Sequence, residues 1–278
     1  AIGRTTHAAL AVAPAQRVRQ IELGLERLRW LPHADGRRFV AINIPMFRLW
    51  AVEAADAAAP PVAMNVIVGR ALDTQTPILF DEMSHVVFRP YWNVPRSIVR
   101  NEVLPALARD ASYLARHDME IVAGPGDDAR AVAPAAEAID ALRDGRLRLR
   151  QRPGPKNSLG LVKFVFPNDD AVYMHGTPAQ QLFGRARRDF SHGCVRLEDP
   201  VALAQWVLRE QPEWTRERIV DAMNGTRTLQ VDLKQPLPVI LYYTTVLATA
   251  DGGAMFADDI YRHDARLERA LAGRPLTD

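Results

Sequence analysis

The sequence contains a single cysteine, Cys194, at the end of the run Ser191-His192-Gly193-Cys194. A thiolate is a strong nucleophile, but a free thiol with a pKa of about 8.5 needs a neighbouring base or cation to form it near neutral pH. His175 lies upstream, directly before Gly176 and Thr177. If the fold brings the two side chains together, the pair predicts covalent catalysis with Cys194 as nucleophile and His175 as general base and acid. An imidazolium beside the sulfur would then lower the pKa of the thiol.

The spacing of these residues also allows a simpler interpretation. A lone cysteine is more often a small buried hydrophobic residue than a catalyst. His175 and Cys194 are too far apart in sequence to meet within one element, so two strands joined by the intervening loop must bring them together. Arginines are frequent in that loop, and we expect them to be solvated unless a substrate rich in carboxylates uses them: Arg185, Arg187 and Arg188.

Hydrophobic periodicity predicts the elements that would hold this pair. Apolar residues at steps of three and four predict an amphipathic helix that packs on the main domain: Val18, Ile21, Leu25 and Leu28. Short β-prone runs predict strands at 39–44, 47–52, 62–68, 159–166 and 171–174, with a hairpin loop at 54–61. After Cys194, an N-capping Asp199 followed by Pro200 predicts a helix that ends near Arg209. The remaining patterns predict a helix at 215–224, strands at 229–233 and 239–247, a tight turn at 251–252 and a closing helix at 260–272.

Between the two groups of strands the composition changes. The strand pattern stops at 90–95, short helices are expected at 98–107 and 113–117, and the stretch 123–136, rich in Ala, Gly, Pro and Asp, is typical of an exposed loop. The fold class is therefore expected to be mainly β with peripheral helices (α+β). We expect a linker at 1–16, a catalytic domain at 17–95 and 151–262, an inserted subdomain at 96–150, and a C-terminal helix and tail at 263–278.

Composition narrows the classes of function. The chain has 278 residues, 48% of them apolar, with 35 basic and 33 acidic residues for a formal charge of +2. The size permits a packed core, and the balanced charge gives no sign of a nucleic-acid binder. A single cysteine excludes an internal disulfide, and no Cys/His cluster has zinc spacing, so we expect neither a metal nor another cofactor. The longest apolar stretch, 238–250, is too short to span a bilayer.

Two motifs resemble a known family. The run Ser191-His192-Gly193-Cys194-Val195-Arg196, downstream of His175-Gly176-Thr177, closely resembles the signature of the L,D-transpeptidase (YkuD-type) catalytic domain. The stretches 89–95 (RPYWNVP) and 153–160 (PGPKNSLG) resemble landmarks of the YcbB-like branch, which carries an inserted capping subdomain. The resemblance covers most of 17–262 and implies a YkuD-like β-sandwich catalytic domain with a helical capping insert.

The resemblance also implies a reaction. Cys194 would attack the carbonyl of the third, L-configured centre of a peptidoglycan stem tetrapeptide, release the terminal D-alanine and form a thioester. An amine of a second stem would then attack the thioester and give a diaminopimelate-to-diaminopimelate cross-link. The implied partners are stem tetrapeptides as donor and acceptor, with carbapenems as inhibitors. The implied location is the periplasm or cell wall, with membrane contact only through a segment preceding this sequence.

The resemblance assigns roles to further residues around the pair. The Gly176 backbone would hold the His175 ring, and the N–H groups of Gly193 and Cys194 would form the oxyanion hole. The catalytic turn would be shaped by two neighbours of the cysteine, His192 and Ser191. The residues expected to bind substrate are Tyr173, Trp92, Tyr91, Asn157, Thr177 and Arg196. For the aromatic residues the alternative is core packing, for Asn157 it is ending the insert, and for Arg196 it is bracing the loop.

Other functions fit the same residues. Water could accept the acyl group, which would make the protein an L,D-carboxypeptidase or a cross-link hydrolase. A non-catalytic wall-binding module is a second alternative, and zinc binding by His175, His192 and Cys194, at poor spacing, is a third. The resemblance favours transfer, with the insert at 96–150 acting as a lid that excludes water from the thioester.

Overall fold

The computed structural model describes residues 3–32, 36–53, 62–249 and 251–274. The chain divides into two compact units. The first comprises 1–82, 186–193 and 237–278, and the second comprises 83–185 and 194–236. The second unit therefore contains both His175 and Cys194.

The first unit is built on a sheet whose strands alternate or run fully buried. β1 pairs with β2 in antiparallel fashion, β2 pairs with β3 in the same way, and β1 is parallel to β13. The short strand β11 is parallel to β3. These strands are β1 (Phe39–Asn43), β2 (Arg48–Val52), β3 (Val62–Gly69), β11 (Asp189–Ser191) and β13 (Leu229–Tyr242). The first three strands were predicted from the sequence and are confirmed, while the hairpin loop predicted at 54–61 lies outside the described residues.

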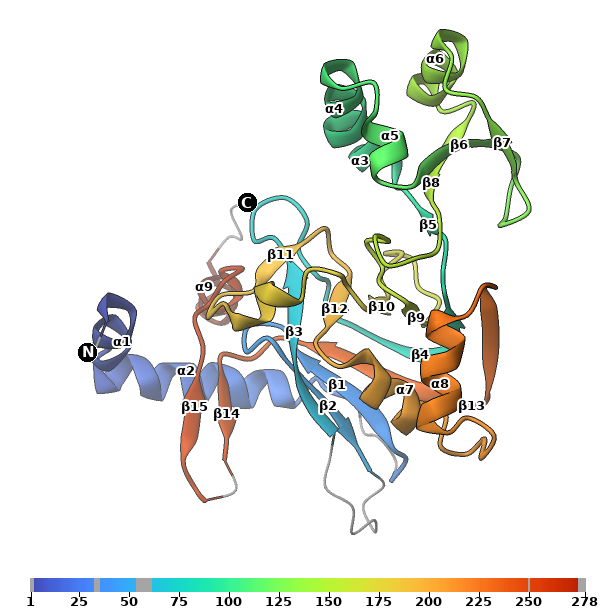
Figure 1. Cartoon of the computed structure of the whole chain (residues 1–278). Helices are drawn as coiled ribbons and strands as arrows, with labels where there is room; N and C mark the ends of the chain where they lie inside the picture. Colours follow the sequence, from blue (N-terminus) through green and yellow to red (C-terminus); the bar gives the residue numbers. More distant parts are fainter. Residues whose placement is uncertain (1–2, 33–35, 54–61, 250, 275–278) are drawn as a thin grey trace. The chain divides into compact units, whose positions relative to one another are not determined.

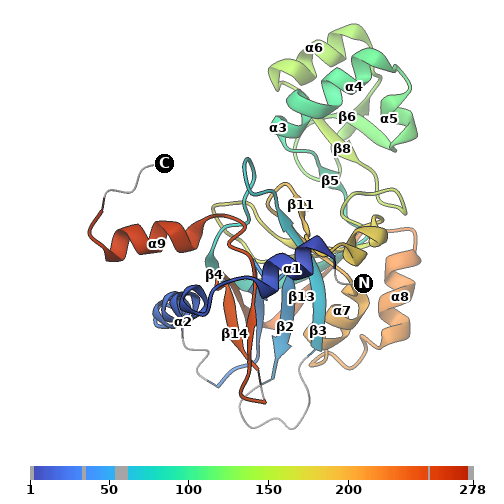
Figure 2. The same ribbon diagram turned by 90° about the vertical axis from the view of Figure 1, so that its left-hand side faces the viewer.

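Helices and a hairpin complete the first unit (Figures 1 and 2). They are α1 (Arg4–Leu10), α2 (Pro14–Leu28), β14 (Val246–Ala248), β15 (Ala254–Phe256) and α9 (His263–Leu271). Helix α2 packs against β14 and α9, as expected for a helix that packs on the domain, but the face is not the predicted one. The predicted apolar stripe is exposed, with Val18 and Leu25 each more than half accessible. The buried positions are Leu23, Gly24 and Arg27.

The reason for this orientation lies in Gly24 and Arg27. A Cβ on Gly24 would lie 2.4 Å from a methyl group of Val246, so only glycine permits so close an approach to β14. Arg27 forms an ion pair with Asp264, and both side chains are largely buried. Close backbone contact and a charged pair thus fix the helix, and its leucine and valine stripe remains at the surface.

The second unit contains the strands that carry the candidate catalytic residues. The order within it is β12-β10-β9-β4, with β10 parallel to β12 and the other pairs antiparallel. Helices α7 and α8 pack together beside this sheet (Figure 1). The bounds are β4 (Leu79–Phe88), β9 (Val162–Val165), β10 (Met174–His175), the 3₁₀ helix η2 (Gln180–Gly184), β12 (Val195–Leu197), α7 (Pro200–Val207) and α8 (Arg216–Asn224). Asp199 caps α7 by accepting a hydrogen bond from the N–H of Ala202 at 2.9 Å, as predicted.

Three strand predictions need correction. The sequence analysis did not predict β4, whose ten residues include several polar side chains and therefore lack a clean alternation. It predicted two strands at 229–233 and 239–247, where the structure has the single long strand β13. Strand β10 has only two residues, because the chain before Met174 forms a turn with Ala171 at a φ of 53°.

The insert is a small α/β layer of its own, drawn in green in Figure 1. Its four strands have the order β5-β8-β6-β7, and its helices cover the sheet through a core that includes Val103, Leu114, Ile121 and Leu149. The elements are β5 (Trp92–Asn93), α3 (Arg96–Ile98), the π-helix η1 (Val99–Val103), α4 (Leu104–Arg109), α5 (Tyr113–Arg116), β6 (Met119–Ala123), β7 (Arg130–Val132), α6 (Ala136–Asp144) and β8 (Arg148–Gln151). The predicted helices are present, but the insert also holds a sheet, and β7 lies inside the predicted loop at 123–136.

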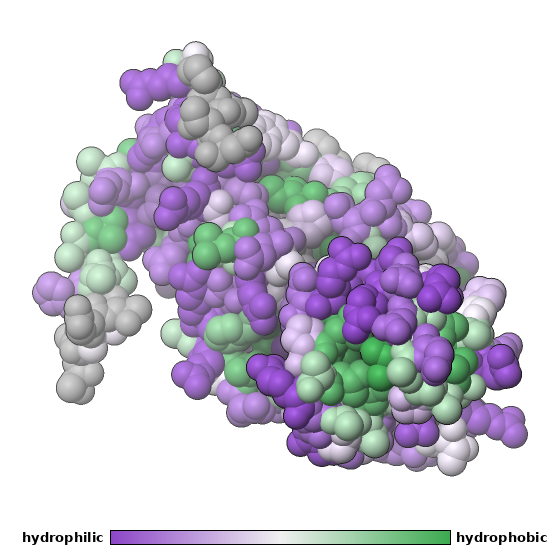
Figure 3. Space-filling model, turned by 90° about the horizontal axis from the view of Figure 1, so that it is seen from above, coloured by the Kyte–Doolittle hydropathy of each residue, from purple (hydrophilic) through white to green (hydrophobic). Residues whose placement is uncertain are grey.

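Part of the apolar surface of the insert stays accessible. In the space-filling view from above, a hydrophobic area lies among hydrophilic side chains (Figure 3). Hydrophobic residues that are only partly covered pack on the insert core, among them Leu104, Leu107 and Ile139. The small insert thus buries a core while leaving some of its helix side chains at the surface.

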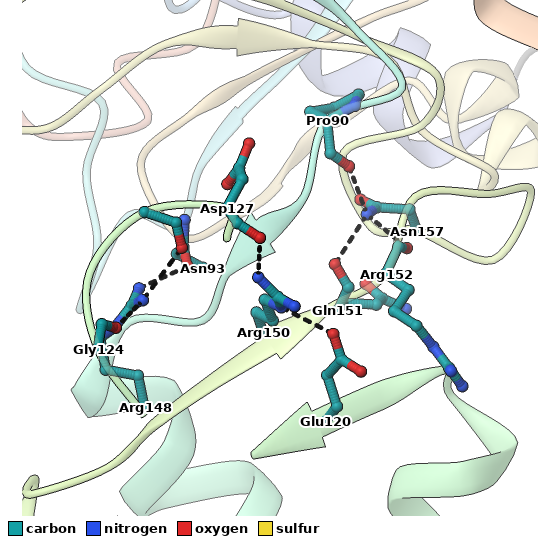
Figure 4. Close-up of polar contacts among 11 residues, drawn as sticks. Pro90, Asn93, Glu120, Gly124, Asp127, Arg148, Arg150, Gln151, Arg152 and Asn157 are labelled. Atoms are coloured by element: carbon teal, nitrogen blue, oxygen red, sulfur yellow. Dashed lines mark hydrogen bonds and ion pairs between the residues drawn. The ribbon is translucent and has the colours of Figure 1, made fainter. Parts of the chain in front are cut away.

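A polar network forms the neck where the insert joins the rest of its unit (Figure 4). Arg150 on β8 donates to Glu120 at 2.7 Å and to the main-chain oxygen of Asp127 at 2.5 Å. Arg148 donates to the side-chain oxygen of Asn93 at 2.8 Å and also to the carbonyl of Gly124. These bonds join β5, β6 and β8 across the base of the insert.

The mainly β fold class with several helices is confirmed by this architecture. None of the helices in the described part of the chain has the length and apolar character needed to cross a membrane.

Candidate active site

The pairing of three strands brings the candidate catalytic residues into one region. His175 on β10 lies directly opposite Lys163 on β9 and Arg196 on β12, so these three side chains share a face of the sheet. Tyr173 directly precedes β10 and Cys194 directly precedes β12. The two chain ends are joined by a hydrogen bond from the N–H of Val195 to the carbonyl of Tyr173, at 3.0 Å. The predicted meeting of the histidine and cysteine strands is present in the structure.

The sulfur of Cys194 lies beside Tyr173. The backbone N–H and the hydroxyl of Tyr173 both act as hydrogen-bond donors to the sulfur, and the Tyr173 oxygen in turn interacts with the side chain of Trp92. The ammonium of Lys163 lies 3.8 Å from the centre of the Tyr173 ring, and the Tyr173 and His175 ring centres are 5.7 Å apart. Tyr173 thus contacts the nucleophile, the candidate base and a cation at once.

The electrostatics differ from the sequence-based expectation. Burial raises the pKa of the Cys194 thiol, and hydrogen bonds from Tyr173 together with the charges of Lys163 and Arg196 act in the opposite direction without overcoming it. Burial, with further contributions from the charges of Arg196 and Lys163, lowers the pKa of His175 to about 3. The predicted imidazolium that lowers the thiol pKa is therefore wrong for the resting protein. Both groups are neutral at neutral pH.

The tautomer of His175 follows from its hydrogen bonds. Nδ1 lies 2.5 Å from the carbonyl oxygen of Gly176, and the carbonyl of Leu159 also bonds to the ring. A carbonyl only accepts, so Nδ1 must carry the proton in the neutral ring. Nε2 then keeps its lone pair and can accept a proton from a thiol. The Gly176 backbone holds the ring, in agreement with the role assigned to it.

A loop that the sequence analysis treated only as a landmark presses on this backbone. Gly160 has a φ of 64°, and a Cβ at this position would lie 2.6 Å from the N atom of Thr177. Only glycine allows both the left-handed conformation and the close approach. Gly160 therefore positions the segment that carries His175 and Gly176.

The turn before the nucleophile has a defined geometry within its own unit. Gly193 has a φ of 109°, a conformation that favours glycine. Its carbonyl accepts a hydrogen bond from the hydroxyl of Thr76 at 2.8 Å, and its N–H donates to the hydroxyl of Ser191 at 3.2 Å. Ser191 is buried and His192 half-buried. Ser191 shapes the turn, and because it engages the Gly193 N–H, the oxyanion hole stays a prediction.

Of the residues predicted to bind substrate, Tyr173 lies next to the nucleophile, and Trp92 interacts with Tyr173. Tyr91 packs against Arg150, whose guanidinium carbon is 4.3 Å from the ring centre. Thr177 is buried, and its hydroxyl accepts from the N–H of Ala179 at 3.2 Å, which leaves it bound to its own turn.

Asn157 has a structural role in this geometry. Its side chain is completely buried, and its amide nitrogen donates to the carbonyls of Pro90 and Arg152, both at 3.0 Å (Figure 4). Its amide oxygen accepts from the N–H of Leu159 at 2.8 Å. The predicted contact of this amide with substrate is therefore replaced by the alternative, in which Asn157 ties the end of the insert to the following loop.

The arginine-rich loop is largely engaged by the chain itself. Arg187 forms two hydrogen bonds to the carboxylate of Asp189, at 2.7 and 2.8 Å. Arg188 donates to the main-chain oxygens of Val66 and Phe47. These two side chains hold the loop in place, and the structure gives no support to the idea that they bind substrate carboxylates.

Sequence reasoning missed Lys163 and Gly160. The signal for Lys163 was present, because it is the one charged residue in the apolar run 159–166 (LGLVKFVF). A lysine is rare in a buried strand unless its charge interacts with another group, and the charge of Lys163 acts on the thiol of Cys194. Within the described residues, no group of three or more His, Cys, Asp or Glu side chains is arranged to hold a metal ion.

A mainly β domain that holds an oriented histidine on one strand and a cysteine directly before the paired strand defines a candidate cysteine-dependent catalytic site. The family model for the YkuD L,D-transpeptidase catalytic domain matches residues 37–233, which include both residues. A protein of Haemophilus influenzae named "Putative L,D-transpeptidase" is 32% identical over 254 residues, which cover 90% of this chain and 49% of that protein. The chain belongs to the YkuD L,D-transpeptidase family. It spans about half the length of this relative.

Proposed function

We propose that the protein is an L,D-transpeptidase that forms diaminopimelate-to-diaminopimelate cross-links in peptidoglycan through a thioester on Cys194. The observation that carries the proposal is the pairing of β10, which ends with His175, and β12, which directly follows Cys194, with the histidine ring held by the carbonyl of Gly176. Membership of the family supports the same reaction class.

In the first half of the reaction, Cys194 acquires the acyl group. The sulfur attacks the carbonyl carbon of the third residue of a stem tetrapeptide, and Nε2 of His175 takes the thiol proton. The C–N bond to the terminal D-alanine then breaks, and the proton moves from His175 to the departing amine. The thioester and free D-alanine are the products. Tyr173 stabilises the sulfur while it is anionic, because it directs two donors at it.

In the second half, a free amine of another stem attacks the thioester carbonyl. Neutral His175 takes a proton from the attacking nitrogen, the C–S bond breaks, and the proton returns to the sulfur. An amide cross-link and the free thiol result. The N–H groups of Gly193 and Cys194 are the proposed donors to the oxyanion in both halves, which requires the Gly193 N–H to exchange its bond with Ser191 for one to substrate.

The remaining parts of the proposal follow from this substrate. Peptidoglycan places the activity in an exported compartment, the periplasm or cell wall. Carbapenems are expected to acylate Cys194 in the same way as the donor peptide. The insert would exclude water and so favour transfer over hydrolysis.

Intact-protein mass spectrometry tests the proposal directly. The full chain is incubated with a stem tetrapeptide, with and without an amine acceptor, beside Cys194→Ala as control. We expect an acyl adduct on the wild-type protein alone, which the acceptor converts to cross-linked product. An adduct that decays only to tripeptide would replace the proposal with a carboxypeptidase or hydrolase, and the absence of any adduct would favour a wall-binding module.

A further inference from the structure

A polar pocket lies in the same unit as Cys194, and none of the roles described above involves it. It has a volume of about 680 Å³, within the range of sites that bind small molecules and peptide groups. Charged residues dominate its lining: Arg89, Arg152, Arg227, Asp127 and Asp128. We call this set the Arg/Asp pocket.

The strand register places the pocket close to the catalytic face. Val87, which also lines the pocket, is directly opposite Lys163, and Lys163 is directly opposite His175. These three residues therefore share a face. Neighbouring strands are about 4.8 Å apart, so the strand bearing Val87 is roughly 10 Å from the strand bearing His175, the span of about three extended residues.

Electrostatic interactions also link the Arg/Asp pocket to Cys194. The carboxylate of Asp127 acts on Lys163, and Lys163 in turn acts on the sulfur of Cys194. Figure 4 shows that Asp127 gives only its main-chain oxygen to Arg150, while its carboxylate points away from that guanidinium. A charge of the pocket therefore acts on Lys163, which in turn acts on Cys194.

The charged side chains of the Arg/Asp pocket, all within the described part of the chain, do not form ion pairs with one another. No ion pair joins its three arginines to its two aspartates among the described residues. Arg89 makes one long contact, at 3.5 Å, to the carbonyl of Pro153, and its Nε is buried without a hydrogen-bond partner. A buried donor without a partner is costly, and a bound carboxylate would satisfy it. The backbone of Arg89 has a φ of 49° and is held by a hydrogen bond from Thr228.

We propose that the Arg/Asp pocket binds the acceptor of the transfer reaction, through a carboxylate that lies several bonds away from the attacking amine. The inference rests on the proposed function and adds to it the surface that selects the acceptor. Arginine binds a carboxylate through paired hydrogen bonds, so the arginines would hold the acceptor while its attacking amine stays outside the pocket. A peptide held there can extend its amine toward the thioester on Cys194.

The pocket would therefore select among acceptors in the second step of the reaction and would not affect acylation by the donor. The bound acceptor amine attacks the thioester carbonyl, the C–S bond breaks, and His175 moves the proton from nitrogen to sulfur. Acceptors without the matching carboxylate lose their contact with the arginines. They reach the thioester less often, and water then takes a larger share of the acyl group.

The first experiment compares two acceptors on the acylated protein. meso-Diaminopimelate carries a carboxylate beside each amine, whereas 1,5-diaminopentane has the same two amines and no carboxylate. We expect the wild type to prefer diaminopimelate by about tenfold, and Arg152→Ala, Arg227→Ala to reduce this preference to about twofold, since one charge-assisted pair contributes on that scale. Arg146→Ala is the matched control, because Arg146 is an exposed arginine of the insert that pairs with Asp144. An unchanged preference in the double variant would overturn the inference, and so would an equal loss in donor acylation.

The second experiment separates this inference from the proposed function. Binding of diaminopimelate and 1,5-diaminopentane is measured by calorimetry on Cys194→Ala, with and without the two arginine substitutions. We expect the preference for diaminopimelate to be present in Cys194→Ala and lost in the triple variant, whether or not the wild type forms a thioester. Equal affinities for the two compounds in Cys194→Ala would disprove the acceptor pocket.

Discussion

The neck of the insert and the catalytic face both bury ionisable groups in the same unit, but the two regions differ in the partners that these groups have. In the neck, the Arg150 side chain is 7% exposed and its charge is matched by Glu120 at 2.7 Å, a main-chain oxygen and the Tyr91 ring. On the catalytic face, no carboxylate is paired with Lys163 or His175 among the described residues. Burial there lowers the pKa of both groups.

This difference separates a region that maintains structure from the region that we propose performs the chemistry. A buried charge with a full set of partners keeps its ionisation state and fixes the geometry of the elements it joins. Buried groups without such partners change their ionisation state, and neutral His175 beside a protonated thiol is the result. The comparison therefore predicts losses of stability at the neck and losses of rate at the catalytic face.

The largest expected effect is at the catalytic face, in His175→Gln. The variant keeps a polar side chain but has no group that can take a proton near neutral pH. We expect donor acylation to slow by roughly a thousandfold, within the range for removal of a general base. Single-turnover mass spectrometry measures it, and a fall of less than tenfold would exclude His175 as the base.

The pH dependence of the same residue sharpens this prediction. The pKa of His175 is lowered to about 3, so the ring is an unprotonated base at any pH above about 4 and should give no loss of rate near pH 6.5. Between pH 6.5 and 3 the unfolded chain binds a proton here that the folded chain does not. Stability is therefore lost as the pH falls through this window, by up to about 1.4 kcal/mol per pH unit. His175→Gln should unfold with a shallower pH dependence, measured by denaturant titration.

At the neck, Arg150→Met should act on stability instead. The substitution leaves the carboxylate of Glu120, which is 18% exposed, without its partner, and we expect a loss of about 2 kcal/mol, less than for a fully buried pair. Hydrogen exchange in β6 and β8 measures the free energy of opening. Arg146→Met, at an exposed pair on the same insert, is the control and should change it by less than about 0.5 kcal/mol. Equal effects of the two variants would remove the distinction between the regions.

The same comparison explains how much of the molecule the sequence could predict. The pairing of the strands next to His175 and Cys194 was expected from local patterns, a glycine before a lone cysteine and a histidine that ends an apolar run, while the catalytic roles of the two residues stay predictions. The first three strands and the capped helix α7 follow from alternation and from Asp199-Pro200. These signals are short in range, so a sequence displays them.

The neck and the electrostatics depend on contacts between distant residues. Nothing near Arg150 in the sequence reveals Glu120 as its partner, and the role of Asn157 depends on Pro90, far upstream. The pKa of His175 depends on burial, which the pattern around it does not fix. The apolar stripe of α2 was wrongly predicted to be buried for the same reason. The face that α2 buries is set by the contact of Gly24 with β14 and by the ion pair of Arg27 with α9.

A smaller effect is expected from Lys163→Met. The ammonium lowers the pKa of the Cys194 thiol, so its loss should raise that pKa further and reduce the thiolate available at neutral pH. We expect acylation at pH 7 to slow by about tenfold and the deficit to shrink as the pH rises. Lys163→Arg keeps the charge and should recover most of the rate. A deficit that is equal at all pH values would indicate a packing role instead.

The smallest effect should come from Tyr173→Phe, which removes one donor from the sulfur and keeps the ring. The backbone N–H of residue 173 remains a second donor to Cys194, and the ring still lies under Lys163. The lost bond is worth about 0.7 kcal/mol, so acylation should slow by about threefold. Tyr173→Leu also removes the ring and its contact with the ammonium, and should slow acylation more than Phe does. If the two variants were equally slow, the hydroxyl alone would account for the contribution of Tyr173, and the cation over its ring would have no part in preparing the sulfur.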